Sequence, residues 1–148
     1  MLLTQKIKTG IRRNIMAKIV IDKKVVRTDR ASAPLGPYSQ GIIANGFVFV
    51  AGEKGVDPKT GKIVPGGIEP ETRQTLENIK AILEEAGSSF DLAVSAVVHM
   101  TNLDDFMTMN NVFAEYFKMD PPGRTTVEVK RLPAGAHVEI TVTSVVKI

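Results

Sequence analysis

The sequence predicts one α+β domain, in which a six-stranded mixed sheet carries two helices on one face. Three observations lead to this fold class: short segments of alternating apolar and polar residues, two segments with apolar residues at helical spacing, and the order of these segments, β-β-β-α-β-α-β-β. With 148 residues, 43% of them hydrophobic, the chain is long enough for one domain with a real core. Each helix joins two strands, so we expect parallel, right-handed crossovers that place both helices on the same side.

The first three strands come before any helix. Residues 18–26 read as an opening strand, and two apolar runs follow at 39–44 and 47–52. Asn45-Gly46 separates these two runs, and this dipeptide is the strongest short signal for a hairpin turn. We therefore expect an antiparallel hairpin over 39–52.

The first helix follows a turn-rich loop at 56–67. Pro70 suits the first turn of a helix, and Gly87 is expected to end it. Between them one apolar stripe recurs at helical spacing, formed by Leu76, Ile79, Leu83 and Ala86. The stripe predicts the face that packs on the sheet.

The second helix lies between a β-branched strand at 92–102 and the last two strands. Asp104 is expected to cap its start, and Pro121-Pro122 blocks its continuation. Its apolar stripe consists of Phe106, Met109, Phe113 and Phe117.

The last two strands lie within residues 121–140 and contain a cation and a carboxylate. Residues of like parity share a face of a strand, so Arg124 lies opposite Val127, and Glu139 lies opposite its apolar neighbours Val138 and Ile140. With the two strands side by side, Arg124 and Glu139 are predicted to share the face of the sheet away from the core. That is the layout of an active site.

Each candidate also has a structural explanation. The guanidinium of Arg124 presents two parallel donors to a carboxylate or phosphate, or it forms a salt bridge with Glu128 or Glu139. Glu139 orients a water as a base, or it is the partner of Arg124. Tyr38 lies in a rigid turn that aims its phenol, or it is a core aromatic whose hydroxyl bonds backbone.

The face without helices is expected to be covered by another subunit. It carries apolar and small polar residues beside the charges, among them Val97, Thr101, Thr141 and Val145. A surface of that composition is typical of an oligomer interface.

Composition excludes several classes of chemistry. There is no cysteine, so disulfides, thiolate metal sites and cysteine nucleophiles are excluded, and two distant histidines argue against any metal site. No apolar run approaches the length of a membrane span. These features favour a cytoplasmic protein without a membrane partner.

Charge is distributed unevenly along the chain. Residues 1–30 hold nine Lys/Arg and two Asp, a net charge of +7, whereas residues 31–148 hold ten Lys/Arg and fourteen Asp/Glu, a net charge of −4. An acidic body argues against nucleic acid as a partner. Residues 1–17 are interpreted as a flexible basic extension before one domain at 18–148. The alternative for residues 1–15, which carry four Lys/Arg and no acid, is an organellar transit peptide.

Six blocks of sequence resemble the YjgF/Rid family, the reactive intermediate deaminase (RidA) group that is also labelled endoribonuclease L-PSP or translation inhibitor. The similarity runs from about residue 18 to 148. The blocks are Ala-Pro-Leu-Gly-Pro-Tyr-Ser-Gln-Gly at 33–41, Val-Ala-Gly at 50–52, Asp-Pro-Lys-Thr-Gly at 57–61, Gln-Thr-Leu-Glu-Asn-Ile at 74–79, Arg-Thr-Thr-Val-Glu-Val at 124–129 and Val-Glu-Ile at 138–140.

The resemblance implies a chorismate-mutase-like subunit in a homotrimer, with sites between subunits. It implies a cofactor-independent hydrolase that converts 2-imino acids, such as 2-iminobutanoate and 2-iminopropanoate, to 2-oxo acids and ammonia. Arg124 would bind the substrate carboxylate, Glu139 would hold the attacking water, and Tyr38 would line the cleft. The alternatives are an endoribonuclease or translation inhibitor, and a non-catalytic trimer that binds small carboxylates.

The resemblance also implies substrate-binding roles for Gly52, Asn110 and Thr126, the first and last through their backbone. Two departures from the family pattern lie next to these residues. Where the family commonly has Ser-Gly-Gln, this chain has Ala51-Gly52-Glu53, and Thr126 stands in place of a frequent cysteine. Arg124 and Glu139 are retained and favour deaminase activity, whereas Ala51 and Glu53 keep the binding-only alternative open.

Overall fold

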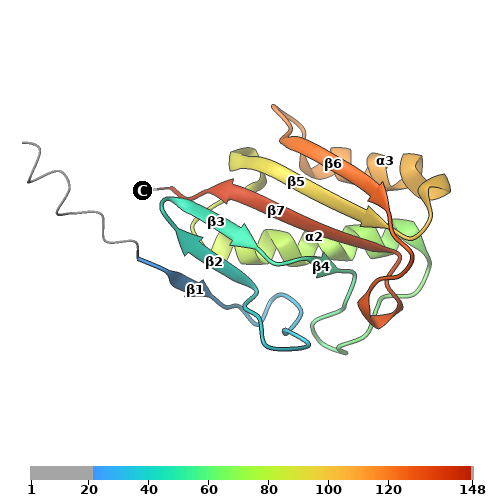
Figure 1. The fold of residues 1–148 in the computed structure, drawn as a ribbon, viewed down its shortest axis with the longest axis horizontal. Helices are drawn as coiled ribbons and strands as arrows, with labels where there is room; N and C mark the ends of the chain where they lie inside the picture. The colour runs from blue at the N-terminus through green and yellow to red at the C-terminus, as the bar shows by residue number, and fades with distance from the viewer. Residues whose placement is uncertain (1–21, 148) are drawn as a thin grey trace, which may run out of the picture.

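The computed structural model describes residues 22–147, so the predicted extension at 1–17 and the first part of the predicted opening strand, residues 18–21, lie outside the described residues. One sheet of seven strands is formed, with two α-helices (Figure 1). Its elements are β1 (Lys24–Val26), β2 (Gly41–Ala44), β3 (Phe47–Val50), β4 (Glu53–Lys54), α2 (Ile68–Glu85), β5 (Ala93–Met100), α3 (Phe106–Tyr116), β6 (Gly123–Glu128) and β7 (Val138–Val145).

The predicted hairpin is confirmed. β2 and β3 pair antiparallel, with Ala44 opposite Phe47. Asn45 and Gly46 have φ of 55° and 82°. Both values lie in the left-handed region that a two-residue hairpin turn requires.

A seventh strand, β4, was missed by the prediction of six. β4 consists of two residues that follow Ala51-Gly52 and pair antiparallel with β7, with Lys54 opposite Glu139. Two residues are too few to show an alternating pattern, so the sequence carries no periodic signal for this strand. Its importance is positional, because it aligns Lys54 with Glu139.

The order of the strands corrects the predicted neighbours. The sheet runs β1-β2-β3-β7-β5-β6, and β4 adds to β7. α3 joins β5 to β6, and these two strands pair in parallel as predicted. However, β6 and β7 are not neighbours, because β5 lies between them. The last strand of the chain enters the middle of the sheet, where the side chains of Val138, Ile140 and Val142 are fully buried.

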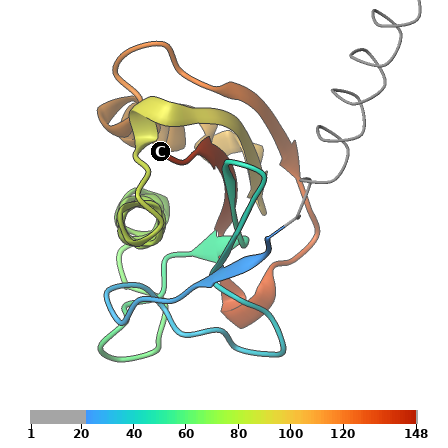
Figure 2. The ribbon, with the colours of Figure 1, turned by 90° about the vertical axis from the view of Figure 1, so that its left-hand side faces the viewer.

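Both helices cover the same face of the sheet (Figure 2). Every residue of the predicted α2 stripe is buried, and Gly87, with φ of 75°, follows the helix end. In α3, Met109 and Phe113 are buried, as is Phe117 just beyond it, whereas Phe106 is partly buried at the rim of the core. The helical periodicity therefore identified the core-facing sides correctly.

The predicted cap of the second helix is wrong. A short 3₁₀ turn, Leu103–Asp105, leads into α3, and its cap is Asn102, whose side chain accepts a hydrogen bond from the Asp104 N–H. Asp104 therefore supplies the capped N–H instead of the capping oxygen. Asn and Asp are equivalent cap formers, so composition could not separate the two positions.

Candidate active site

Arg124 extends over the helix-covered face, at the edge strand β6. It lies in register with Ala96 of β5, a buried residue on that face. The guanidinium carbon lies 4.7 Å from the ring centre of Phe113 and 5.7 Å from that of Phe106. One Nη donates to Oδ1 of Asn110 at 2.7 Å. Two aromatic faces and an amide therefore fix the cation in place.

No carboxylate of residues 22–147 forms an ion pair with this arginine. Burial lowers the pKa of the guanidinium. The salt bridges considered from the sequence are not formed, because Glu128 accepts the N–H of Leu103 and Glu139 contacts Lys54. A partly buried, unneutralised guanidinium is a site for an anion.

Glu139 lies on the other face of the sheet, and this corrects the predicted shared face. It pairs with His99 of β5, on the face that neither helix covers, which we call the open face. The prediction assumed that Val127 faces the core, but Val127 is 40% exposed on the open face, in register with His99. Within one chain Arg124 and Glu139 are thus separated by the sheet itself.

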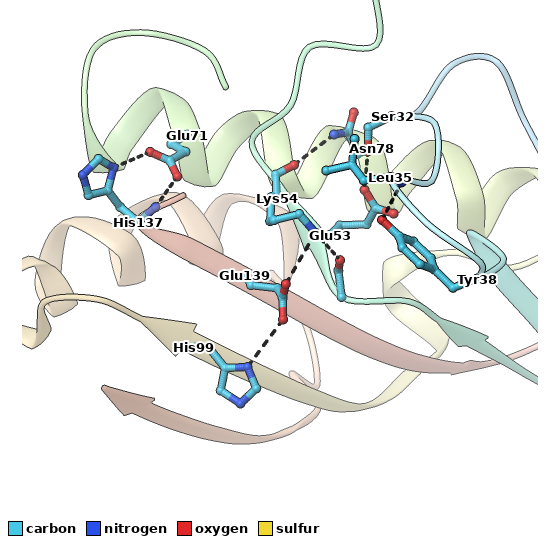
Figure 3. A network of polar contacts seen from close by, with 11 residues as sticks. Ser32, Leu35, Tyr38, Glu53, Lys54, Glu71, Asn78, His99, His137 and Glu139 are labelled. Carbon is cyan, nitrogen blue, oxygen red and sulfur yellow. Dashed lines mark hydrogen bonds and ion pairs between the residues drawn. The ribbon is translucent and has the colours of Figure 1, made fainter. Parts of the chain in front are cut away.

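Lys54 and His99 lie on either side of the Glu139 carboxylate (Figure 3), and Gly52 lies close to it. Lys54 Nζ lies 3.4 Å from one carboxylate oxygen, and His99 Nδ1 lies 3.7 Å from the other. A Cβ on Gly52 would lie 2.8 Å from the Glu139 carboxyl carbon, so only glycine leaves room for this carboxylate. The Glu139 side chain is 19% exposed. It is an accessible acid with a lysine beside it.

α2 holds β4 in position beneath this cluster. The side-chain amide of Asn78, fully buried, donates to the backbone oxygens of Lys54 and Val56 at 3.1 and 2.9 Å. Gly55 lies so close to α2 that a Cβ there would be 2.6 Å from the backbone oxygen of Glu71. These contacts with α2 therefore help to fix the position of β4.

Glu53, the neighbour of Lys54, is almost completely buried. Its carboxylate accepts a hydrogen bond from the Ser32 hydroxyl at 2.8 Å. Burial raises the pKa of Glu53 to about 7, and the nearby charge of Glu139 adds to that rise, whereas the Ser32 hydrogen bond and Lys54 oppose it. Gln40 fixes the loop that carries Ser32 by donating to the Ser32 carbonyl oxygen at 2.9 Å.

Tyr38 lies in the loop next to Glu53, with its ring 44% exposed. Its hydroxyl accepts a hydrogen bond from the Leu35 N–H at 2.9 Å (Figure 3). The core position considered from the sequence is excluded. The backbone bond holds the phenol on the surface side of the cluster, where Tyr38, Glu53 and Lys54 line one small hollow.

Thr126 shares the helix-facing side of β6 with Arg124. Its hydroxyl is buried and makes no hydrogen bond to the described residues. A buried hydroxyl without a partner is costly, which suits a position that a ligand completes.

Sequence reasoning missed Lys54 and His99 as neighbours of Glu139. Their only signal was the register of β4 and β5 against β7, which depends on strand pairing rather than on local pattern.

The second histidine, His137, contacts Glu71 of α2, with 2.8 Å between His137 Nδ1 and a carboxylate oxygen. Among residues 22–147, no group of three or more His, Asp and Glu side chains is arranged to hold a metal ion. No helix in that range combines the length and apolarity that crossing a membrane requires.

The structure is thus an α+β sheet with a fixed arginine on one face and a carboxylate on the other. The endoribonuclease L-PSP family model matches residues 28–146. The chain belongs to this family, the YjgF/Rid family.

Relatives of this chain include archaeal, bacterial and mammalian proteins. A RutC family protein of Pyrococcus horikoshii is 51% identical over 118 residues, covering 80% of this chain and 94% of that protein. The 2-iminobutanoate/2-iminopropanoate deaminase of Bos taurus is 40% identical over 118 residues, covering 80% and 86%. The crystal structure of E. coli TdcF with bound serine matches with a TM-score of 0.78 at 37% identity, covering 84% of this chain and 99% of that one.

Proposed function

We propose that this protein hydrolyses 2-imino acids, such as 2-iminobutanoate and 2-iminopropanoate, to 2-oxo acids and ammonia. The observation that carries the proposal is Arg124, a fixed and partly buried guanidinium with no carboxylate partner among the described residues. Mammalian relatives named 2-iminobutanoate/2-iminopropanoate deaminase support the reaction. E. coli TdcF, whose structure holds serine, supports a ligand of amino-acid size.

We further propose that each site lies between two subunits of a homotrimer. Arg124 and Glu139 lie on opposite faces of one sheet, so they can act on one small substrate only if different chains supply them. The open face also carries large apolar side chains, with Phe49 48% and Val127 40% exposed. An apolar surface of this kind suits a subunit interface.

The proposed reaction needs only positioning and one proton acceptor. Arg124 binds the substrate carboxylate through two parallel N–H donors. Glu139 of the neighbouring subunit accepts a hydrogen bond from a water and takes its proton as the oxygen attacks the imine carbon. Glu139 passes this proton to the imine nitrogen. It then takes the hydroxyl proton of the tetrahedral intermediate and passes it to the same nitrogen, so that the carbonyl forms, the C–N bond breaks and ammonia leaves. One water is consumed, and one 2-oxo acid and one ammonia are formed.

The other residues expected from the family complete the proposed site. Asn110 orients Arg124, and the backbone of Thr126 lies beside it on the same strand. Gly52 keeps the approach to Glu139 open, because any side chain there would displace the carboxylate. Tyr38 lies at the rim, beside Glu53 and Lys54.

A coupled assay with a pyridoxal-dependent dehydratase tests the function. We expect the protein to accelerate release of the 2-oxo acid. Arg124→Ala should lower kcat/KM by about 100-fold or more, because it removes the guanidinium that pairs with the desolvated substrate carboxylate. Glu139→Gln should lower kcat by about 10²–10⁴-fold, since it removes the proton acceptor. Arg73→Ala is the matched control, because Arg73 is an exposed arginine on α2 that pairs with Glu115.

Two outcomes would overturn this function. If the wild-type protein leaves the rate unchanged but binds 2-oxo acids, the non-catalytic alternative holds. Full activity of the Arg124→Ala protein would show that the arginine does not bind the substrate.

A further inference from the structure

Lys54 is a charged residue of the site that the proposed reaction leaves unused. Its side chain is only 9% exposed and lies across from Glu139 in the β4–β7 pair. Its ammonium donates to the Gly52 carbonyl oxygen at 3.1 Å and to a Glu139 carboxylate oxygen at 3.4 Å. The ammonium therefore contacts Glu139, which holds the water in the proposed site, and Gly52, which keeps the approach to Glu139 open.

Stability alone is a poor reason for this lysine. Taking a lysine and a glutamate out of water costs several kcal/mol per ion in general, and apolar replacements of such pairs are often neutral or stabilising. The contact between Lys54 and Glu139 is also long for a charge-assisted hydrogen bond, which typically spans about 2.7–2.9 Å. The pair is loose, and it is only partly covered on the Glu139 side.

The hydrogen bonds that Lys54 makes to residues 22–147 leave one of its donors free. An ammonium has three N–H donors. Within residues 22–147, Gly52 and Glu139 are the acceptors that receive hydrogen bonds from it. The other charged or titratable groups of residues 22–147 near the Glu139–Lys54 pair are Glu53 on β4, His99 on β5 and the phenol of Tyr38, which lines a hollow with Lys54. A ligand group lying over Gly52 and Glu139 could therefore accept the remaining N–H.

We infer that Lys54 is a further ligand-binding residue, and that its ammonium donates to the carbonyl oxygen at C2 of a bound 2-oxo acid. The inference rests on the proposed function for the position of the acid, whose carboxylate lies on Arg124 of the neighbouring subunit. A 2-oxo oxygen accepts a hydrogen bond from an ammonium, whereas a CH₂ group at C2 accepts none. Lys54 thus makes the site selective for the 2-oxo acid over the same acid without a group at C2.

Binding measurements test Lys54 without requiring turnover. Calorimetric affinities of 2-oxobutanoate and butanoate are compared on the full-length protein, so that the ratio isolates the C2 carbonyl from the shared carboxylate. We expect the wild type to prefer 2-oxobutanoate by about tenfold or more, the range of a hydrogen bond to a charged group. In Lys54→Met the preference should fall to about twofold or less. Lys54→Arg, which keeps a cationic donor, should restore part of it.

The control and the second variant separate binding from structure. A merely structural lysine would weaken both acids equally and leave their ratio unchanged. Lys80→Met, on the exposed side of α2, should keep the wild-type ratio. If Lys54→Met does not fold, Lys54→Gln replaces it as a neutral variant with a polar end.

An unchanged ratio in a folded neutral variant would overturn the inference, as would a wild-type protein that does not distinguish the two acids or binds neither. Failure of the deaminase proposal is seen separately, as absence of imine turnover.

Discussion

Glu53 is an acidic residue in an environment that disfavours its charged form. Its side chain is buried, it receives one hydrogen bond from Ser32, and Glu139 adds a second negative charge nearby. These features favour the protonated acid, with a pKa of about 7. The protonated acid has the shape and neutrality of glutamine, the residue that the family commonly has here. Below about pH 7 the Glu53 side chain is therefore neutral, like a glutamine, and above that pH it is a buried negative charge.

Stability is expected to depend on pH through Glu53. The folded-state pKa is raised from 4.5 to about 7, so the folded protein holds a proton that the unfolded chain releases. The contribution of Glu53 to the free energy of unfolding is therefore highest below about pH 4.5. It falls by about 3 kcal/mol in total as the pH rises to about 7. Glu53→Gln should remove that loss and be more stable than the wild type at pH 8, as measured by urea unfolding at pH 5 and pH 8.

The matched control for this prediction is Glu69→Gln, which changes an exposed glutamate on α2. Its stability should follow the wild type at both pH values. If Glu53→Gln showed the same pH dependence as the wild type, the carboxyl would be ionised throughout, contrary to the expectation.

At the scale of elements, β4 depends on its neighbours far more than the longer elements do. The α2 stripe and the Asn45-Gly46 hairpin follow from local pattern, because period and turn chemistry act over a few residues. β4 has only two residues, and its position comes from β7 on one side and from Asn78 of α2 on the other. Such a strand is predictable only when its partners are known.

Removing the Asn78 amide should loosen β4. Asn78→Ala takes the side-chain donor away from the buried Val56 oxygen, and it leaves the Lys54 oxygen with the Val56 N–H, at 2.8 Å, as its donor. A buried acceptor left unsatisfied costs about 1–3 kcal/mol, so for the Val56 oxygen we expect a loss of about 1–3 kcal/mol in the free energy of unfolding. Activity should fall as well, since Lys54 and Glu139 lose their alignment. Urea unfolding followed by circular dichroism measures the first effect.

Asn111→Ala, an exposed position on α3, is the control and should change stability by no more than about 0.5 kcal/mol. A similarly small effect of Asn78→Ala would show that β4 does not rely on α2.

At the scale of the whole molecule, the strand order decides which residues can act together. β5 separates β6 from β7. The register of these two strands against β5 places Arg124 of β6 and Glu139 of β7 on opposite faces. In a single subunit the two residues cannot meet around one small acid. In an oligomer, the edge beside α3 of one chain can face the open face of the next.

Mixing two inactive proteins should restore activity if the sites are shared. Arg124→Ala and Glu139→Gln subunits are unfolded together in equal amounts and refolded, so that mixed oligomers form. A site that takes its arginine from one subunit and its glutamate from the other is then intact in about a quarter of cases. We expect about a quarter of wild-type activity in the coupled assay.

Each variant refolded alone is the control and should stay inactive, while light scattering gives the oligomeric state. A mixture with no more activity than its parts would place both residues of a working site in one chain.

The sequence by itself determined the fold class, the core-facing stripes of both helices, the hairpin and the candidate pair Arg124 and Glu139. These follow from local periodicity, turn chemistry and residue type. Only the tertiary structure decided that β5 lies between their strands, that the two residues occupy opposite faces, and that Lys54 lies beside Glu139. Strand order and register depend on contacts between residues far apart in the chain, and a shift of one residue moves a side chain to the other face.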